Sequence, residues 1–177
     1  KELESSFDIK LSMSIGYGEN PYDANLDAYE AKKSQKFLNE QYSIFGTLNG
    51  HSEHSVTVMH LDVDDITSIR KKSMSPYDTS SLMFKIYSRM SEYFLSKNSL
   101  TFFMGGDNFM VVTNSEFKSF AKDFIQISKD EFQIELNCGI GTASTSRDAV
   151  KLATESLDTI REIRDAGKEK PEIYELN

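Results

Sequence analysis

Two acidic stretches contain the side chains best suited to chemistry. "HLDVDDIT" supplies Asp62, Asp64 and Asp65 directly after an apolar run, and "FFMGGDNFM" places Asp107 and Asn108 beside a glycine pair between two apolar runs. Carboxylates are depleted in strands, and two held close together repel unless a cation lies between them. Oxygen ligands select Mg²⁺ or Mn²⁺, and magnesium pairs few carboxylates with phosphate oxygens. The pattern predicts metal-assisted chemistry on a nucleoside triphosphate.

Backbone groups next to these acids extend the predicted site. The carbonyl of Val63 offers a further metal ligand where the strand ends, and Gly105 and Gly106 let a substrate approach the backbone. The N–H groups of the following turn are predicted to face phosphates; they belong to Asp65, Ile66 and Thr67. The alternative is that the aspartates only cap a turn and a helix start.

The elements that must position these residues follow a recognisable order. The chain from residue 55 onward predicts strand, helix, hairpin, helix and strand, then a helix over Asp148 to Asp165 and a last strand near "EIYEL". This is the βαββαβ order of an α+β, ferredoxin-like domain, with an antiparallel sheet and helices on one face. Its first strand is central and neighbours a hairpin strand, so we expect Asp62 and Asp107 to come within shared reach.

An internal repeat indicates a partial second copy of this unit. "FDIKLSMSIGYGENPYDA" (Phe7 to Ala24) and "FQIELNCGIGTASTSRDA" (Phe132 to Ala149) align without gaps, and both read as strand, glycine, polar turn and helix start. Only the second copy follows a complete set of preceding elements. We therefore expect residues 1–48 to be the C-terminal part of a first ferredoxin-like domain, 49–54 a linker, and 55–177 a complete second domain.

Composition narrows the class of protein. The 177 residues carry a formal net charge of −8, which argues against a broad grip on nucleic acid. The single cysteine, Cys138, lies in an alternating apolar run and is expected to be a buried strand thiol. No apolar run reaches the roughly 20 residues of a membrane helix. These features predict a soluble cytoplasmic protein with no membrane partner.

Taken together, the motifs resemble a known family. "HLDVDDIT", "YDT" (Tyr77 to Thr79), "FFMGGDNFM" and "ELNCGIGTASTSRDAVKLATESLDTIR" resemble the second of the two tandem domains of archaeal GTP cyclohydrolase type III, and "SMSIGYGENPYDA" resembles the end of the first. The family is related to the nucleotidyl-cyclase palm, including the GGDEF domain. The resemblance implies Mg²⁺-dependent opening of the guanine imidazole ring of GTP to a formamidopyrimidine monophosphate, with release of two inorganic phosphates.

Residue roles follow from the same resemblance. It implies that Asp62, the Val63 carbonyl and Asp107 bind the metal, and that Asp62, Asp107 and Asn108 are the catalytic candidates. Arg161 stands where a basic residue of the last helix meets phosphate in cyclases; without the resemblance, a solvated arginine explains it equally well. The resemblance further implies K⁺ as a monovalent activator, a homo-oligomer, and a place in flavin or deazaflavin synthesis.

Other functions stay open at this point. A nucleotidyl cyclase of the diguanylate-cyclase type would use the same metal site, although Asn108 stands where those enzymes carry a second acid. A non-catalytic GTP-binding module is the third possibility. A zinc site is disfavoured, because His51 and His54 lie in a polar linker and His60 suits a satisfied sheet position. The turn "GGDN" also lacks the Lys-Ser/Thr of a P-loop.

Overall fold

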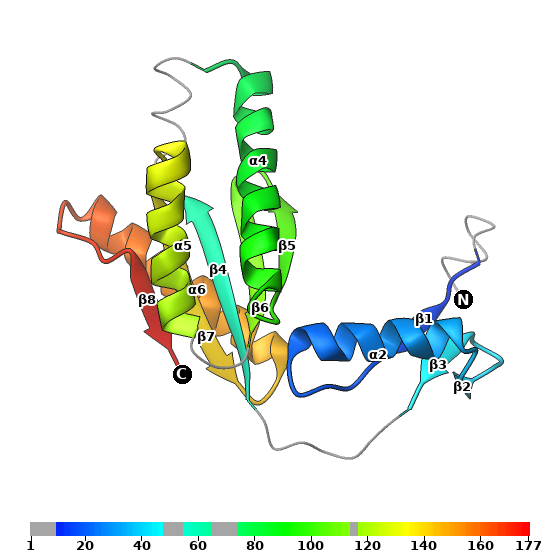
Figure 1. Ribbon diagram of the computed structural model, residues 1–177. Helices are drawn as coiled ribbons and strands as arrows, with labels where there is room; N and C mark the ends of the chain where they lie inside the picture. The colour runs from blue at the N-terminus through cyan, green and yellow to red at the C-terminus, as the bar shows by residue number, and fades with distance from the viewer. Residues whose placement is uncertain (1–9, 48–54, 65–73, 114–116) are drawn as a thin grey trace. The chain divides into compact units, whose positions relative to one another are not determined.

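The chain forms two compact units, Lys1–Ser52 and Glu53–Asn177. The computed structural model describes residues 10–47, 55–64, 74–113 and 117–177 (Figure 1). Among these residues, no helix combines the length and the apolar character that crossing a membrane requires.

The second unit is built on a five-stranded sheet in the order β5-β6-β4-β7-β8. Its strands are β4 (Val56–Val63), β5 (Leu100–Gly105), β6 (Asn108–Thr113), β7 (Leu136–Ala143) and β8 (Ile173–Leu176). Strand β4 is central and runs antiparallel to both β6 and β7, as the βαββαβ order predicts. The last strand, β8, adds to β7 in parallel, so the complete sheet is mixed.

Helices cover both faces of this sheet. Helices α4 (Pro76–Leu95) and α5 (Phe117–Phe132) lie on one face, and α6 (Ser146–Asp165) lies on the other (Figure 1). Alternation along β4 explains the two layers, because Met59, Leu61 and Val63 join the core under α4 and α5, whereas Val58 packs with alanines of α6. The expectation that the helices lie on one face of the sheet is confirmed for α4 and α5. It is wrong for α6, which comes after the βαββαβ elements and covers the other face.

The residues that begin and end these elements have local causes. Ser75 and Asp78 form a reciprocal capping box at the start of α4, with Pro76 at the first helical position. At the other end of the domain, α5 continues through Phe132 and the chain turns at Gln133 with φ 57°. Strand β7 therefore begins at Leu136, later than the apolar alternation from Phe132 suggests.

The first unit repeats the last part of the second. It comprises β1 (Met13–Ile15), α2 (Pro21–Lys33), β2 (Phe37–Asn39) and β3 (Ile44–Gly46). Strand β1 pairs in parallel with β3 across helix α2, as β7 pairs in parallel with β8 across α6. A Cβ placed on Gly16 would meet the carbonyl of Ala24 and the amide of Ala28.

The second unit shows the same close approach at the positions that the repeat aligns. A Cβ placed on Gly141 would meet the carbonyl of Ala149 and the amide of Ala153. The helix caps match as well, since Asn20 accepts from the amide of Asp23 and Thr145 accepts from the amide of Asp148. Gly16 directly follows β1 and Gly141 lies within β7. At both positions the absence of a side chain lets the helix pack directly against the backbone.

Candidate active site

Asp62 is buried near the end of the central strand. It is 5% exposed, and the β-sheet register places it between Asn108 of β6 and Asn137 of β7. Because Asp107 directly precedes Asn108 at the tip of the β5–β6 hairpin, the pairing brings the two acidic stretches together. The proximity of Asp62 and Asp107 follows from the antiparallel topology.

Arg161 of α6 is the cationic partner of Asp62. Its Nε and Nη2 atoms donate to Asp62 Oδ2 at 3.2 and 2.7 Å, and its Nη1 donates to Asp158 at 2.9 Å. Burial raises the pKa of Asp62 even though Arg161 opposes the shift. The second oxygen, Asp62 Oδ1, is buried without a hydrogen-bond partner. A buried, unpartnered carboxylate oxygen is an available ligand position for a cation.

Asp107 and Asn108 form one end of a polar chain through the sheet. Asn108 Nδ2 donates to Asp107 Oδ1 at 3.0 Å, and Asn108 Oδ1 lies 3.1 Å from His60 Nε2. On the other side of the imidazole, His60 Nδ1 lies 3.2 Å from the hydroxyl of Thr154. The partners of His60 agree with the prediction of a satisfied sheet histidine.

A second ionic cluster surrounds Asp64, on the same side of the sheet as Asp62. Lys170 Nζ lies 3.0 Å from Asp64 Oδ2, and Arg164 and Asn137 both donate to Asp64 Oδ1. Burial alone would raise the pKa of Asp64, but the hydrogen bonds from Lys170, Asn137 and Arg164 outweigh it and lower the pKa. Asp64 is therefore an ionised, paired carboxylate.

These partners of Asp64 were not among the predicted site residues. Asn137 carried a weak signal, as a polar residue inside the apolar run "FQIELNCGI" opposite the acidic strand. Arg164 had only helical spacing from Arg161 to suggest a shared face. Nothing local distinguishes Lys170 in the sequence, because its contact depends on how α6 leads into β8.

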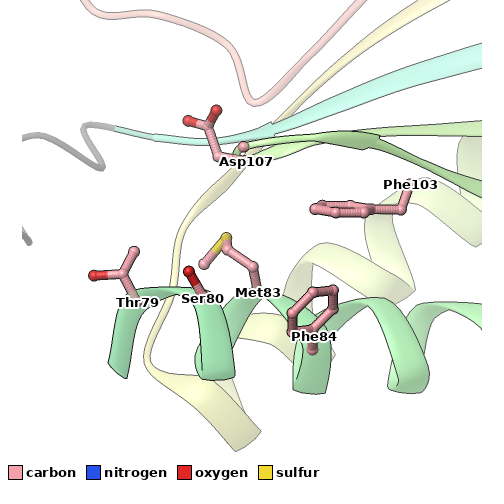
Figure 2. A pocket seen from close by; sticks show the side chains of 7 residues that line it. Thr79, Ser80, Met83, Phe84, Phe103 and Asp107 are labelled. Carbon is pink, nitrogen blue, oxygen red and sulfur yellow. The ribbon is translucent and has the colours of Figure 1, made fainter. Parts of the chain in front are cut away.

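The hairpin tip and α4 enclose a cavity of about 260 Å³ (Figure 2). Its lining combines aromatic, apolar and polar groups: Thr79, Ser80, Met83, Phe84, Phe103, Gly106 and Asp107. Figure 2 shows the Asp107 carboxylate directed away from α4, so its oxygens lie outside the floor of the cavity.

The two hairpin glycines are required by the turn itself. Gly105 and Gly106 have φ 101° and 64°, a region that side chains disfavour. A Cβ added to either glycine would meet no atom within 4 Å among the described residues. The prediction that these glycines permit close approach by a substrate is compatible with this open space, but the turn conformation is sufficient to explain them.

The donors near Asp62 suit a hard divalent cation. Asp62 Oδ1 and the Asp107 carboxylate can act as oxygen ligands. Val63, whose carbonyl is the third predicted ligand, follows Asp62 as the last residue of β4. Within the described ranges no group of three or more His, Cys, Asp or Glu side chains is placed to hold a metal. A site with few carboxylates, completed by backbone, water or phosphate oxygens, is the arrangement that Mg²⁺ uses.

The remaining predicted residues fall into two groups. The turn of Asp65, Ile66 and Thr67 lies outside the described residues, as do His51 and His54. Cys138 is fully buried in the core under α4 and α5, and burial raises the pKa of its thiol far above the ordinary range. That thiol is a packing group, as its place in an apolar strand predicts.

Solved structures share the fold of this chain. The active GGEEF domain of a diguanylate cyclase from Vibrio cholerae superposes with a TM-score of 0.52 at 15% identity, covering 70% of this chain and 85% of that one. The catalytic core of a rhodopsin-guanylyl cyclase gives a TM-score of 0.50 at 21% identity, covering 60% and 73%. These similarities establish the nucleotidyl-cyclase palm fold predicted from the element order.

Curated relatives share the sequence as well. GTP cyclohydrolase III of Methanothermobacter thermautotrophicus is 31% identical over 166 residues, covering 91% of this chain and 66% of the relative. The proteins of the same name from Methanocaldococcus jannaschii and Methanococcus vannielii are 28% and 31% identical, with 61% and 65% of their lengths covered. The chain thus spans about two thirds of the length of these relatives, or slightly less.

The family model for GTP cyclohydrolase III matches residues 1–172. This match includes both repeat copies and the strand, hairpin and helix that carry Asp62, Asp107 and Arg161. The chain therefore belongs to the GTP cyclohydrolase III family.

Proposed function

We propose that the complete protein is a Mg²⁺-dependent GTP cyclohydrolase. One water opens the imidazole ring of guanine and leaves the formyl group on the product, and two further waters release the outer phosphates as inorganic phosphate. The product is a formamidopyrimidine ribonucleotide monophosphate. The observation that carries the proposal is the buried Asp62, whose Oδ1 lacks a partner, in register with the hairpin that presents Asp107.

In this proposal Asp62 Oδ1, the Val63 carbonyl and Asp107 hold the cation. When bound, Mg²⁺ supplies positive charge that stabilises negative charge developing on phosphate and attacking oxygen atoms. Arg161 opposes the effect of burial on the pKa of Asp62, and it leaves Oδ1 available because it donates to Oδ2 only. The Arg161 side chain is about one third exposed, which also allows it to face a phosphate.

The cavity under the hairpin is the proposed site for the guanine base. The rings of Phe84 and Phe103, whose centroids are 5.6 Å apart, offer flat apolar surface. The hydroxyls of Thr79 and Ser80 offer polar contacts. Gly105 and Gly106 then allow the nucleotide to pass over the tip toward the carboxylates. The amides of Asp65, Ile66 and Thr67 are proposed to face the phosphates, as the motif order of the family suggests.

Further features of the proposal rest on the family. We include K⁺ as a monovalent activator, assembly into a homo-oligomer, and a place in flavin or deazaflavin cofactor synthesis. We also propose that the first unit is the C-terminal part of a related domain, because its glycine contacts and helix cap repeat those of the second unit.

A nucleotidyl cyclase is the second candidate, favoured by the shared palm fold. In that reaction a ribose 3′-hydroxyl attacks the α-phosphate and pyrophosphate leaves. Asn108 disfavours it, because its amide occupies the position of the second acid and is hydrogen-bonded to Asp107 and His60. The third candidate, a GTP-binding module without turnover, requires the same residues to bind nucleotide only.

Product analysis separates the three candidates. The complete protein is incubated with GTP and Mg²⁺ while the ultraviolet spectrum, phosphate and pyrophosphate are followed. The proposal expects loss of the guanine spectrum with two phosphates released per GTP. An unchanged spectrum with pyrophosphate release would identify a cyclase, and nucleotide binding without any product would identify a binding module.

A further inference from the structure

Thr154, His60, Asn108 and Asp107 form a continuous chain of polar contacts from α6 to the hairpin tip. Successive contacts measure 3.2 Å from Thr154 to His60, 3.1 Å from His60 to Asn108 and 3.0 Å from Asn108 to Asp107. The chain crosses the face of the sheet that α6 covers. It connects a buried part of the domain to a proposed metal ligand.

The hydrogen positions along this chain follow from the carboxylate at its end. An ionised carboxylate only accepts hydrogen bonds, so the amide nitrogen of Asn108 must face Asp107. The amide oxygen then faces His60 Nε2, and because that oxygen also only accepts, Nε2 must carry a hydrogen. Rotating the Asn108 amide by half a turn would place its oxygen next to the Asp107 carboxylate. Both groups only accept hydrogen bonds, so that orientation is unfavourable.

The other imidazole nitrogen is then an acceptor. A neutral imidazole carries one hydrogen, and the contact with the Asn108 amide oxygen places it on Nε2. With that hydrogen on Nε2, Nδ1 must accept from the Thr154 hydroxyl. The same hydroxyl is placed to donate to the carbonyl of Val150 at 3.0 Å. That carbonyl already accepts from an amide within α6, so we assign the single hydroxyl hydrogen of Thr154 to Nδ1.

We propose that Thr154 and His60 are positioning residues that hold the Asn108 amide in one orientation, so that Asn108 donates to Asp107 and aims that carboxylate toward Asp62. The contacts run in one direction, from Thr154 through His60 and Asn108 to Asp107. Asp107 Oδ1 is occupied by this chain, which leaves Oδ2 to face a cation. The role in metal binding rests on the proposed function; the hydrogen positions do not.

Nuclear magnetic resonance tests the hydrogen positions in the intact protein. Long-range ¹⁵N–¹H correlation spectra distinguish the two neutral tautomers and the imidazolium, and a His60→Gln variant identifies the resonances of His60. The proposal expects the Nε2–H tautomer at neutral pH. The Nδ1–H tautomer or an imidazolium would overturn it.

Matched threonine variants test the start of the chain. Thr154→Val is expected to move the ¹⁵N chemical shift of His60 Nδ1 to that of a ring nitrogen that accepts no hydrogen bond. Thr154→Ser should restore the wild-type chemical shift. Thr159→Val is the control, because Thr159 lies on the same helix and bonds the Glu155 carbonyl without touching the histidine. Equal effects of Thr154→Val and Thr159→Val would contradict the assignment.

Metal affinity tests the positioning role. Mn²⁺ binding is measured by electron paramagnetic resonance with the β,γ-imido analogue of GTP present. His60→Phe should weaken Mn²⁺ binding by about 10-fold, the lower end of the range for losing a partner of a metal ligand, because His60 acts on Asp107 only through Asn108. Unchanged affinity in a folded His60→Phe protein would overturn the role. If Mn²⁺ binding weakens as expected but wild-type protein leaves GTP unchanged, only the proposed function fails.

Discussion

Replacing Arg161 tests how much its charge stabilises the buried Asp62. In the metal-free protein, Arg161→Gln removes the cation that faces a carboxylate whose side chain is 7% exposed. Arg89→Gln is the matched control: Arg89 forms a similar pair with Glu131, and both arginine side chains are 34% exposed, but the Glu131 side chain is 42% exposed. The two variants differ chiefly in the burial of the acid left behind.

The expected costs differ because of that burial. Removing one partner of a fully buried ion pair costs about 3–5 kcal/mol, whereas an exposed pair contributes about 0.2–1 kcal/mol. Since Arg161 is itself one third exposed, solvent screens part of the interaction, and we expect Arg161→Gln to lower the free energy of unfolding by about 2 kcal/mol. For Arg89→Gln, whose partner Glu131 is exposed, we expect a much smaller loss.

Urea unfolding followed by circular dichroism measures both variants without metal or nucleotide. Adding Asp62→Asn to Arg161→Gln should recover much of the lost stability, because the double variant no longer buries an unpaired charge. The explanation by burial is wrong if Arg161→Gln costs no more stability than Arg89→Gln. It is also refuted if the double variant is no more stable than Arg161→Gln alone.

Three further predictions test the site, the packing and the ionisation of a tyrosine. Asp107→Asn should lower GTP turnover by about 100-fold with little change in the urea midpoint; unchanged turnover would remove Asp107 from the metal site. Gly141→Ala, whose Cβ would lie 2.3 Å from backbone atoms of α6, should cost about 3 kcal/mol on urea unfolding. Gly106→Ala, with open space but φ 64°, should cost about 1 kcal/mol, so equal costs would contradict the packing. Burial, with Asp123 adding to it, raises the pKa of Tyr93 to about 12, so this phenol stabilises the fold below about pH 10 and the contribution is lost as pH rises toward 12. Tyr93→Phe should remove a late component of the tyrosinate absorbance titration, and an unaltered titration would refute the shift.

Local patterns were sufficient for the elements that carry the acids. The apolar run "VTVMHLDV" coincides with β4, a central strand that is buried on both faces from Thr57 to Val63. The hairpin followed from its glycines, and the neighbouring positions of Asp62 and Asn108 followed from the βαββαβ order. The repeat likewise identified Gly16 and Gly141 as equivalent before their contacts were known.

Long-range partners could not be predicted in the same way. The pairing of Arg161 with Asp62 depends on α6 covering the face opposite α4 and α5, which the expected single helical face did not include. The contact of Lys170 with Asp64 depends on the path from α6 to β8. His60 was assigned to a satisfied sheet position, but its two partners come from β6 and α6, and no local pattern specifies them.

Crystallography can test directly whether Asp62 and Asp107 together hold the cation against GTP. Crystals of the complete protein grown with Mn²⁺ and the β,γ-imido analogue of GTP would locate the ion by its anomalous scattering. We expect a peak in contact with Asp62 Oδ1, the Val63 carbonyl and the Asp107 carboxylate, with phosphate oxygens completing the site. An ion held by the triphosphate alone, with Asp62 Oδ1 and Asp107 both free of it, would show that these carboxylates do not form the metal site.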